Sequence, residues 1–249
     1  MATNTHIVDT ERCRERLFEA LITGSRPAAR DLVEQARAEG LPAEHVLTDL
    51  FWPLYETIET LHRQDQLSQL SYRLASRLLR VLVDQGSQAL DRPAPIGRTV
   101  FAVSGPSEGD EMGAQLAVDL LEARGYDVTY AGGGIPNDEI MGQIHESRPD
   151  VFLTFATAPT DLPEIRALID NLHEIGACPD LQIAVGGGVF NRAEGLAEEI
   201  GADIWAADPL EMVESLTDLP AQRATADQRT VGKKRLNPTG TPAQQRKAA

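Results

Sequence analysis

The spacing of apolar residues changes once along this chain, near residue 95. Before that point apolar side chains recur every three or four residues, which is typical of amphipathic helices. Pro53 falls inside one of these apolar stretches, where we expect it to kink or interrupt the helix. The pattern predicts helices over 11–23, 25–40, 42–61 and 68–90. Four helices with short links indicate a small antiparallel bundle over residues 10–90.

Beyond a short linker, runs typical of strands alternate with helical patterns. The strand candidates are 99–104, 127–131, 151–155, 182–185 and 204–206, and the helix candidates are 111–124, 137–147, 161–176, 191–200 and 209–218. The inner strands are almost continuously apolar, as expected for a parallel sheet covered on both faces. The pattern therefore predicts an α/β fold: a four-helix bundle followed, over 98–218, by a five-stranded parallel Rossmann-like (flavodoxin-like) sheet that binds ligands at the carboxyl ends of its strands.

The net charge of −15 over 249 residues is unevenly distributed. Residues 221–249 hold seven lysine or arginine side chains against one aspartate, which leaves 16 basic and 37 acidic side chains in residues 1–220. The acidic part is expected to repel nucleic acids and anionic membranes. The basic tail has almost no large apolar residues, so we predict disorder over 221–249. Such a tail either adds solubility or contacts nucleic acid or the protein's own acidic surface.

Nothing in the sequence indicates a membrane or secretory protein. No apolar run approaches the ~20 residues of a membrane-spanning helix, and the first residues are polar rather than signal-like. The two cysteines, Cys13 and Cys178, lie far apart and in no metal-binding spacing. A cytoplasmic protein without disulfide bonds is therefore predicted.

Glycine-rich loops follow several of the predicted strands. One runs from Ser104 to Gly113, and others contain Gly132-Gly133-Gly134 and Gly186-Gly187-Gly188. In order and spacing these loops, with the helical region before them, resemble the landmarks of cobalamin (vitamin B12)-binding domains that carry an N-terminal helical cap. Such domains occur in methionine synthase, in corrinoid proteins of methyltransferases and in B12-dependent light-sensing regulators. The resemblance covers residues 10–218 and implies the same cap-plus-sheet fold.

The loop after the first strand departs from the family pattern. In the family it reads Asp-x-His-x-x-Gly; the histidine is the lower cobalt ligand and the aspartate orients it. Here Gly113 matches the glycine, but Asp110 stands at the histidine position and Glu108 at the aspartate position. A carboxylate is a poor substitute for imidazole on cobalt. Histidine-on cobalamin is therefore not expected, and a corrinoid or related tetrapyrrole would bind atypically, with its own base on cobalt or through the cap.

The positions that line the family's slot for the cobalamin nucleotide tail are also changed. Gly186 and Gly187 match its glycine pair after the fourth strand. Of the family's Ser-x-Leu after the third strand, Phe155 falls at the serine and Thr157 at the leucine, whereas a shift of one residue places Thr154 at the serine. A phenylalanine there would occupy much of the volume that the tail needs.

The cap differs in the same way. Light-sensing relatives carry a tryptophan over the upper face of the cofactor and a Glu-His pair about ten residues later. Here His62 lies at or beside the tryptophan position, and Tyr72 and Arg73 replace the pair. His62 is a candidate upper ligand of cobalt or, alternatively, an exposed histidine at a helix end. Trp52 is predicted to be a core residue.

The sequence does not favour an enzyme. No Ser/His/Asp or Cys/His set converges on the predicted strand ends, and the glycines of the first loop lack the Gly-x-Gly-x-x-Gly fingerprint of nucleotide-binding domains. A phosphoryl-accepting receiver would need a carboxylate where Thr154-Phe155-Ala156 stands. The acids Glu108, Asp110 and Glu111 could hold a hard cation, but acids at a helix start more often cap it.

Three hypotheses for function remain. The first, which we expect, is a non-enzymatic regulatory or sensor protein on a B12-binding fold, with atypical corrinoid binding. The second is a ligand-free protein-interaction module that acts on a transcription factor or another partner. The third is a corrinoid carrier subunit for a methyltransferase. We further expect a protein partner, nucleic-acid contact only through the basic tail and no membrane association, and we leave a homo-oligomer open.

Overall fold

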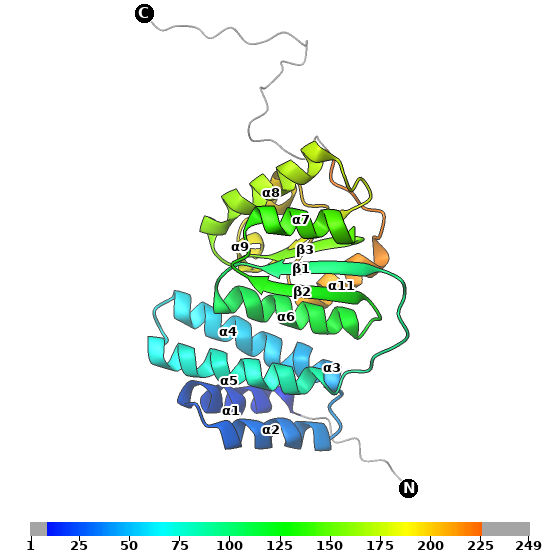
Figure 1. The fold of residues 1–249 in the computed structure, drawn as a ribbon. Helices are drawn as coiled ribbons and strands as arrows, with labels where there is room; N and C mark the ends of the chain where they lie inside the picture. The colour runs from blue at the N-terminus through cyan, green and yellow to red at the C-terminus, as the bar shows by residue number, and fades with distance from the viewer. Residues whose placement is uncertain (1–8, 226–249) are drawn as a thin grey trace, which may run out of the picture.

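The computed structural model describes residues 9–225, and the first part of this range is a stack of helices (Figure 1). These are α1 (Thr10–Thr23), α2 (Arg26–Ala38), α3 (Ala43–His45), the π-helix η1 (Val46–Phe51), α4 (Trp52–Arg63) and α5 (Gln69–Ser87). α1 packs against α2 and α5, and α4 packs against α5. Gly24 ends α1 in the left-handed conformation, with φ 71°, which glycine adopts without strain. The predicted helical cap is confirmed.

A π-helix precedes Pro53 inside the third predicted helix. The backbone N–H of Trp52 donates to the carbonyl of Leu47, five residues back. Pro53 then falls in the first turn of α4, where its missing N–H costs little. The wider turn absorbs the break, so the chain stays helical from Ala43 to Arg63.

The second part is a five-stranded parallel sheet, as predicted. Its strands are β1 (Thr99–Ser104), β2 (Asp127–Gly133), β3 (Val151–Phe155), β4 (Gln182–Gly186) and β5 (Ile204–Ala206). They lie in the order β2-β1-β3-β4-β5, which is the flavodoxin-like order. β1 and β3 are direct neighbours, with Ser104 beside Phe155 at their carboxyl ends. The chain crosses to the opposite side of the sheet at this point, which is where ligands bind in such folds.

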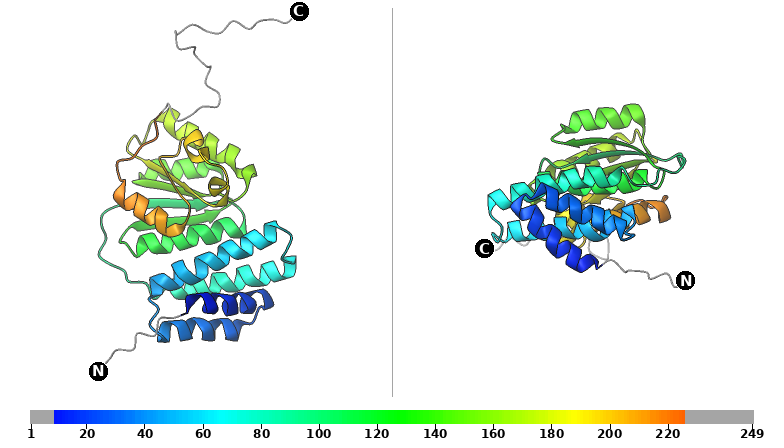
Figure 2. Two further views of the ribbon diagram at one scale, coloured as in Figure 1. Left: turned by 180° about the vertical axis from the view of Figure 1, so that it is seen from behind. Right: turned by 90° about the horizontal axis from the view of Figure 1, so that it is seen from below.

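Helices cover both faces of the sheet. α6 (Glu108–Glu122) and α11 (Pro209–Asp218) lie on one face, and α7 (Asn137–Ser147), α8 (Leu162–Ile175), α9 (Gly188–Asn191) and α10 (Leu196–Ile200) lie on the other. A short 3-10 helix, η2 (Pro159–Asp161), leads into α8. The helix predicted near 191–200 is shorter in the structure: α9 ends at Asn191 and α10 begins at Leu196, after Gly195 with a φ of 77°. The cap packs on the outer side of α6, as the two side views show (Figures 1 and 2).

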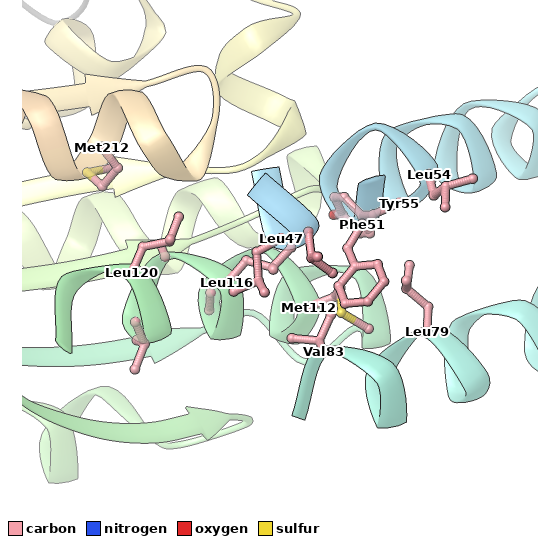
Figure 3. Close-up of a cluster of buried hydrophobic side chains, with 14 of the residues drawn as sticks. Leu47, Phe51, Leu54, Tyr55, Leu79, Val83, Met112, Leu116, Leu120 and Met212 are labelled. Carbon is pink, nitrogen blue, oxygen red and sulfur yellow. The ribbon is translucent and has the colours of Figure 1, made fainter. Parts of the chain in front are cut away.

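The cap and the sheet share one hydrophobic core. Leu47 and Phe51 of η1 and Val83 of α5 belong to the same buried cluster as Leu116 and Leu120 of α6 (Figure 3). Each of these side chains is at most 2% exposed. A second cluster fills the opposite face, under α7 and α8. Because the core is continuous from cap to sheet, we infer that the two parts fold as one unit.

The end of the described chain is held against the sheet domain. The Gln222 side chain donates to the carbonyl of Asp203, and the backbone N–H of Ala224 donates to an Asp203 carboxylate oxygen. The predicted disorder of the basic tail otherwise concerns residues 226–249, which lie outside the described residues. Cys13 and Cys178 are free thiols. Within residues 9–225 no helix is long and apolar enough to span a membrane.

Candidate functional site

The predicted ligand loop leads directly into the first turn of α6. Ser107 is the N-cap of this helix, and its Oγ accepts from the backbone N–H of Asp110 at 3.0 Å. In return, Asp110 Oδ2 accepts from the Ser107 hydroxyl at 2.6 Å and from the Ser107 backbone N–H at 3.2 Å. This reciprocal arrangement is a capping box. The helix already includes Glu108, so Asp110 is a helix-capping side chain and not part of a free loop.

Asp110 is buried, with 1% of its surface exposed. Its other oxygen, Oδ1, has no hydrogen-bond partner among the described residues. Burial raises the pKa of this carboxyl, hydrogen bonds from Ser107 and Thr157 lower it, and the carboxylate of Asp161 raises it again. A Cβ at Gly105 would clash with Asp110 Oδ2 and stand 3.3 Å from Asp161 Oδ2. The Asp110 carboxylate is thus enclosed by the loop that leads into α6.

The Phe155 ring lies between two glycines named by the resemblance. Gly186 was assigned to the nucleotide-tail slot and Gly113 to the edge of the corrin. A Cβ at Gly186 would stand 2.5 Å from Cε1 of Phe155, and one at Gly113 would stand 3.9 Å from Cδ1. Phe155 is 4% exposed. Thr154 points to the other face of the sheet, where it lines a cavity of about 260 Å³ between β1, β3 and α8. Of the two registers considered, the one with Phe155 facing Gly186 is therefore present.

Packing alone requires glycine at both positions at the end of β4, Gly186 and Gly187. Gly186 leaves room for the Phe155 ring, and Gly187 adopts a φ of 105°. A Cβ at Gly187 would clash with the carbonyl oxygen of Ala156. These glycines are thus explained without a nucleotide tail.

Helix α4 covers the start of α6 from the cap side. The Tyr55 hydroxyl donates to the carbonyl of Gly109 at 2.9 Å. A Cβ at Gly109 would stand 3.1 Å from the Glu59 carboxylate, and one at Gly113 would stand 4.0 Å from the Trp52 ring. Trp52, Tyr55 and Glu59 are spaced by three and four residues and share one face of α4. The sequence prediction placed Trp52 in the core, whereas the ring lies half-buried at this contact.

The cap residues named by the resemblance lie beside this face. The His62 and Tyr72 rings stack, with centroids 3.8 Å apart. The Tyr72 hydroxyl donates to Glu59 at 2.8 Å. Burial raises the pKa of the Glu59 carboxyl, although the Tyr72 hydrogen bond opposes the shift. His62 Nδ1 has no hydrogen-bond partner among the described residues, and Arg73 is an exposed residue of α5.

An arginine that sequence reasoning missed lies at the carboxyl edge of the sheet. Arg192 ends α9, and its guanidinium donates to the carbonyl of Thr157 at 2.5 Å. It also lies over Gly188, where a Cβ would stand 2.7 Å from Nη1. Burial lowers the pKa of the Arg192 guanidinium, and the charge of Arg63 on α4 lowers it further. The Thr157 carbonyl thus holds Arg192 at the carboxyl edge of the sheet.

This arrangement offers binding surfaces and no catalytic set. Among residues 9–225 no group of three or more His, Cys, Asp or Glu side chains is placed to hold a metal ion. Asp110 and the other predicted loop positions lie on the sheet side, and His62, Tyr72 and Arg73 lie in the cap. Glu59 connects the two sets, because it contacts both Gly109 and Tyr72. The shared face of Trp52, Tyr55 and Glu59 on α4 could be read from their helical spacing, whereas only the tertiary fold brings Arg192 beside Thr157.

Comparisons with known proteins match both parts of the chain. The profile of a B12 binding domain matches residues 98–214, and that of a second B12 binding domain matches residues 13–85. Dimethylamine corrinoid protein 1 of Methanosarcina acetivorans is 25% identical over 213 residues, which is 85% of this chain and 99% of the relative. The dimethylamine corrinoid protein of Methanosarcina barkeri is 24% identical over the same shares.

The fold of a solved structure agrees. The monomethylamine corrinoid protein of Methanosarcina barkeri superposes with a TM-score of 0.72, covering 84% of this chain and 99% of that chain. The two sequences are 16% identical, so this likeness concerns the fold. It contains the same succession of helical cap and Rossmann-like sheet.

These relatives correct one prediction and confirm others. The expected regulatory or sensor function is wrong, because the relatives that match over nearly their whole length are named corrinoid proteins and none is named a regulator. The third hypothesis, a corrinoid carrier, agrees with them. The prediction that the chain is not itself an enzyme is confirmed by the same relatives. With both profiles and these full-length relatives in agreement, the chain belongs to the family of cobalamin-binding domains with an N-terminal helical cap.

Proposed function

We propose that this protein is a corrinoid carrier for a methyltransferase, and that it holds a cobalamin whose own base stays on cobalt. The observation that carries the proposal is the match to dimethylamine corrinoid proteins over 99% of their length, cap included. A corrinoid bound in this way would supply a cobalt able to accept a methyl group from one partner and to pass it to another. The residues of this chain would bind and enclose it between α4 and the carboxyl edge of the sheet.

The chemistry of the sheet side supports the base-on form. A protein-derived lower ligand would require an imidazole at position 110, where a carboxylate is committed to the capping box with Ser107. The nucleotide tail would require the space beside Gly186 that the Phe155 ring fills. His62 is engaged in a stack with Tyr72 inside the cap. A cobalamin that keeps its base needs neither a protein imidazole nor the slot.

The partner follows from the relatives' names. Dimethylamine corrinoid proteins are named for a methylated amine, so we propose a methyltransferase that acts on methylated amines as the partner of this chain.

One spectroscopic experiment tests cobalamin binding and the identity of the lower ligand. Protein labelled uniformly with ¹⁵N is incubated with unlabelled hydroxocobalamin, desalted and reduced to the cob(II)alamin state. Electron paramagnetic resonance then reports the nitrogen below cobalt. We expect each cobalt line to split into three, as produced by the ¹⁴N of the cofactor's own base. Splitting into two would reveal a protein imidazole and overturn the base-on form, and loss of all colour on desalting would overturn the corrinoid carrier.

A gain-of-ligand variant tests why the base stays on. Asp110→His combined with Phe155→Ser restores both the imidazole and the slot, so we expect two-line splitting in the labelled double variant. Phe155→Ser alone is the matched control and should keep the three-line pattern, because it opens the slot without supplying a ligand. Unchanged three-line splitting in the double variant would contradict the assignment of these two positions.

A further inference from the structure

The cavity of about 260 Å³ at the carboxyl edge of the sheet has no role in the proposed function. It lies between the ends of β1 and β3, on the face that α7 and α8 cover. These two strands are the neighbours from which the chain crosses to opposite faces of the sheet, which is where such folds bind ligands. The volume is just below the ~300 Å³ at which most small-molecule sites begin, so the cavity suits a small molecule. None of its lining residues in the described chain belongs to α4 or α6, so it is separate from the proposed corrinoid site.

The walls of this cavity are largely apolar, and one buried polar side chain faces it. Ile140 of α7 and Ile165 and Leu168 of α8 line the cavity, and all three are buried. Thr154 of β3 also lines it and is 3% exposed, yet its hydroxyl has no hydrogen-bond partner among residues 9–225. Polar groups at such depth are normally hydrogen-bonded, so this hydroxyl is available to an occupant of the cavity.

The charged part of the lining is entirely negative. Asp161 and Glu164 line the cavity at the start of α8, and no lysine or arginine does so in the described chain. Asp161 occupies the N-cap position of α8, but its side chain makes no capping hydrogen bond, and its buried Oδ2 has no partner among the described residues. The arginine of α8, Arg166, pairs instead with Asp170 and Glu199. The cavity therefore offers an unpaired carboxylate oxygen beside apolar walls.

This unpaired oxygen lies close to a second carboxylate. A Cβ at Gly105, which also lines the cavity, would stand 3.3 Å from Asp161 Oδ2 and would clash with Asp110 Oδ2. Asp110 is buried as well, and its Oδ1 has no partner among residues 9–225. Two like charges in so enclosed a place destabilise one another, and a bound cation would offset that cost.

We propose that this cavity binds a small organic cation of the alkylammonium class, with its nitrogen against Asp161 and its alkyl part between α7 and α8. The Asp161 carboxylate accepts N–H bonds from the ammonium, and such charge-assisted bonds are stronger than bonds from a neutral donor. The apolar walls favour an alkyl group over a metal ion, which prefers a shell of oxygen ligands and water. No three His, Cys, Asp or Glu side chains of the described chain are grouped to hold a metal. The inference goes beyond the proposed function and does not rest on it.

Three probes with the same alkyl group test the preference for a cation. They are 3-methylbutylammonium, the neutral 3-methylbutan-1-ol and the anion 3-methylbutanoate. Each is titrated at neutral pH into the ¹⁵N-labelled full chain, and the amide signals are followed by nuclear magnetic resonance. We expect saturable shifts at Thr154 and Ile165 with the ammonium, an affinity at least about fivefold lower for the alcohol, and no saturation with the carboxylate. Equal affinity for the alcohol would overturn the proposal, and so would ammonium binding that leaves Thr154 unshifted, because it would show pairing with acids at the surface only.

Substitutions at the acids locate the charged group. Asp161→Asn keeps the shape of the side chain and removes its charge, so ammonium binding should weaken about tenfold and alcohol binding less than about twofold. Glu164→Gln should act in the same direction with a smaller effect, because Glu164 is exposed. Asp138→Asn on α7 is the matched control, since it removes an exposed carboxylate that does not line the cavity. Equal losses in Asp138→Asn and Asp161→Asn would trace the preference to the overall acidity of the protein and contradict a site at Asp161.

Magnesium chloride is the competing probe. If Mg²⁺ produces saturable shifts at Gly105 and Asp161 while the ammonium produces none, the acids serve a metal ion and the proposal fails. Shifts with the ammonium that persist in excess Mg²⁺ support it. The result is distinct from that of the corrinoid experiments: a protein that loses hydroxocobalamin on desalting but binds the ammonium would disprove the carrier and retain this site.

Discussion

Two of the contacts between the cap and the sheet domain have opposite chemistry. The core contact is apolar and joins Leu47, Phe51 and Val83 of the cap to Leu116 and Leu120 of α6 (Figure 3). The edge contact lies at the start of the same helix and is polar. It includes the Tyr55 and Glu59 side chains against Gly109. Beside them, Arg80 of α5 forms an ion pair with Glu111 of α6.

The difference indicates where the cap can move. The core contact buries large apolar side chains. Opening it would cost free energy roughly in proportion to the apolar area exposed. At the edge contact, Tyr55 of the cap donates one hydrogen bond to the backbone of α6. Burial also raises the pKa of the Glu59 carboxyl there. The Arg80–Glu111 ion pair is partly exposed, so water can replace it at small cost. The buried Tyr55 hydrogen bond can be replaced once water reaches the Gly109 carbonyl. We therefore infer that the cap pivots on the core contact and opens at the edge contact, which is the end where a corrinoid would enter.

The largest expected effect is loss of the core contact. Phe51 is fully buried, so Phe51→Ala should lower the free energy of unfolding by about 4 kcal/mol. Because the core is shared, urea unfolding followed by fluorescence and by circular dichroism should show one common transition at lower urea. Leu70→Ala, at a side chain that is 70% exposed, is the control and should change stability little. Two separate transitions in Phe51→Ala would show that the cap unfolds alone.

A buried acid next to the core contact gives the second effect, in the opposite direction. Asp119 on α6 is 8% exposed, and its Oδ2 has no partner among the described residues. Burial raises its pKa to about 7 from an ordinary value of 3.8, against a hydrogen bond from Gln115. The folded state therefore holds a proton that the unfolded state has released, and stability falls as pH rises between these values.

Removing that acid should stabilise the protein at high pH only. Asp119→Asn is expected to raise the free energy of unfolding at pH 8 by about 2 kcal/mol and to change it little near pH 4. Asp31→Asn on α2, an exposed aspartate, is the matched control. Urea titrations at both pH values measure the effect. An equal gain at both pH values would contradict a raised pKa at Asp119.

The third effect concerns the capping box at the edge. Ser107→Ala removes the oxygen that accepts from the Asp110 backbone N–H and the hydroxyl that donates to its carboxylate. We expect a loss of about 1 kcal/mol in the free energy of unfolding. Ser68 is the N-cap of α5, away from the sheet edge, and its Oγ accepts from the Ser71 backbone N–H, so Ser68→Ala should cost a similar amount. Only Ser107→Ala should also weaken corrinoid binding; equal binding by both variants would argue against a corrinoid above this loop.

The sequence predicted most of this architecture, and the failures have physical causes. The strands were recognisable because a buried parallel strand is an uninterrupted apolar run, as in Val151–Phe155. The role of Asp110 was harder to predict, since the same spacing serves a ligand loop and a capping box. Phe155 and Thr154 differ by one residue, and only the observed pairing of β3 decides which of them faces Gly186.

The site residues were predictable only where local spacing reveals them. Trp52, Tyr55 and Glu59 follow a helical repeat, so a closer reading of α4 would have found the face that covers α6. Arg192 lies 35 residues from Thr157, whose carbonyl it contacts at the sheet edge, and no local pattern relates the two. The function was mispredicted because changed ligand positions were interpreted as loss of the carrier role. A carrier that keeps the cofactor's own base on cobalt does not need those positions.

The smallest expected effect tests the edge contact alone. Tyr55→Phe removes the hydrogen bond to the Gly109 carbonyl. We expect the free energy of unfolding to fall by about 0.5 kcal/mol, because water can reach the carbonyl once α4 moves. Amide hydrogen exchange over residues 109–113 should accelerate, and hydroxocobalamin should associate faster with the variant. Tyr72→Phe is the matched control, since its hydroxyl donates to Glu59 within the cap and does not join cap to sheet. If Tyr72→Phe accelerates exchange and association as much as Tyr55→Phe does, the cap does not open at this contact, and the pivot on the shared core must be abandoned.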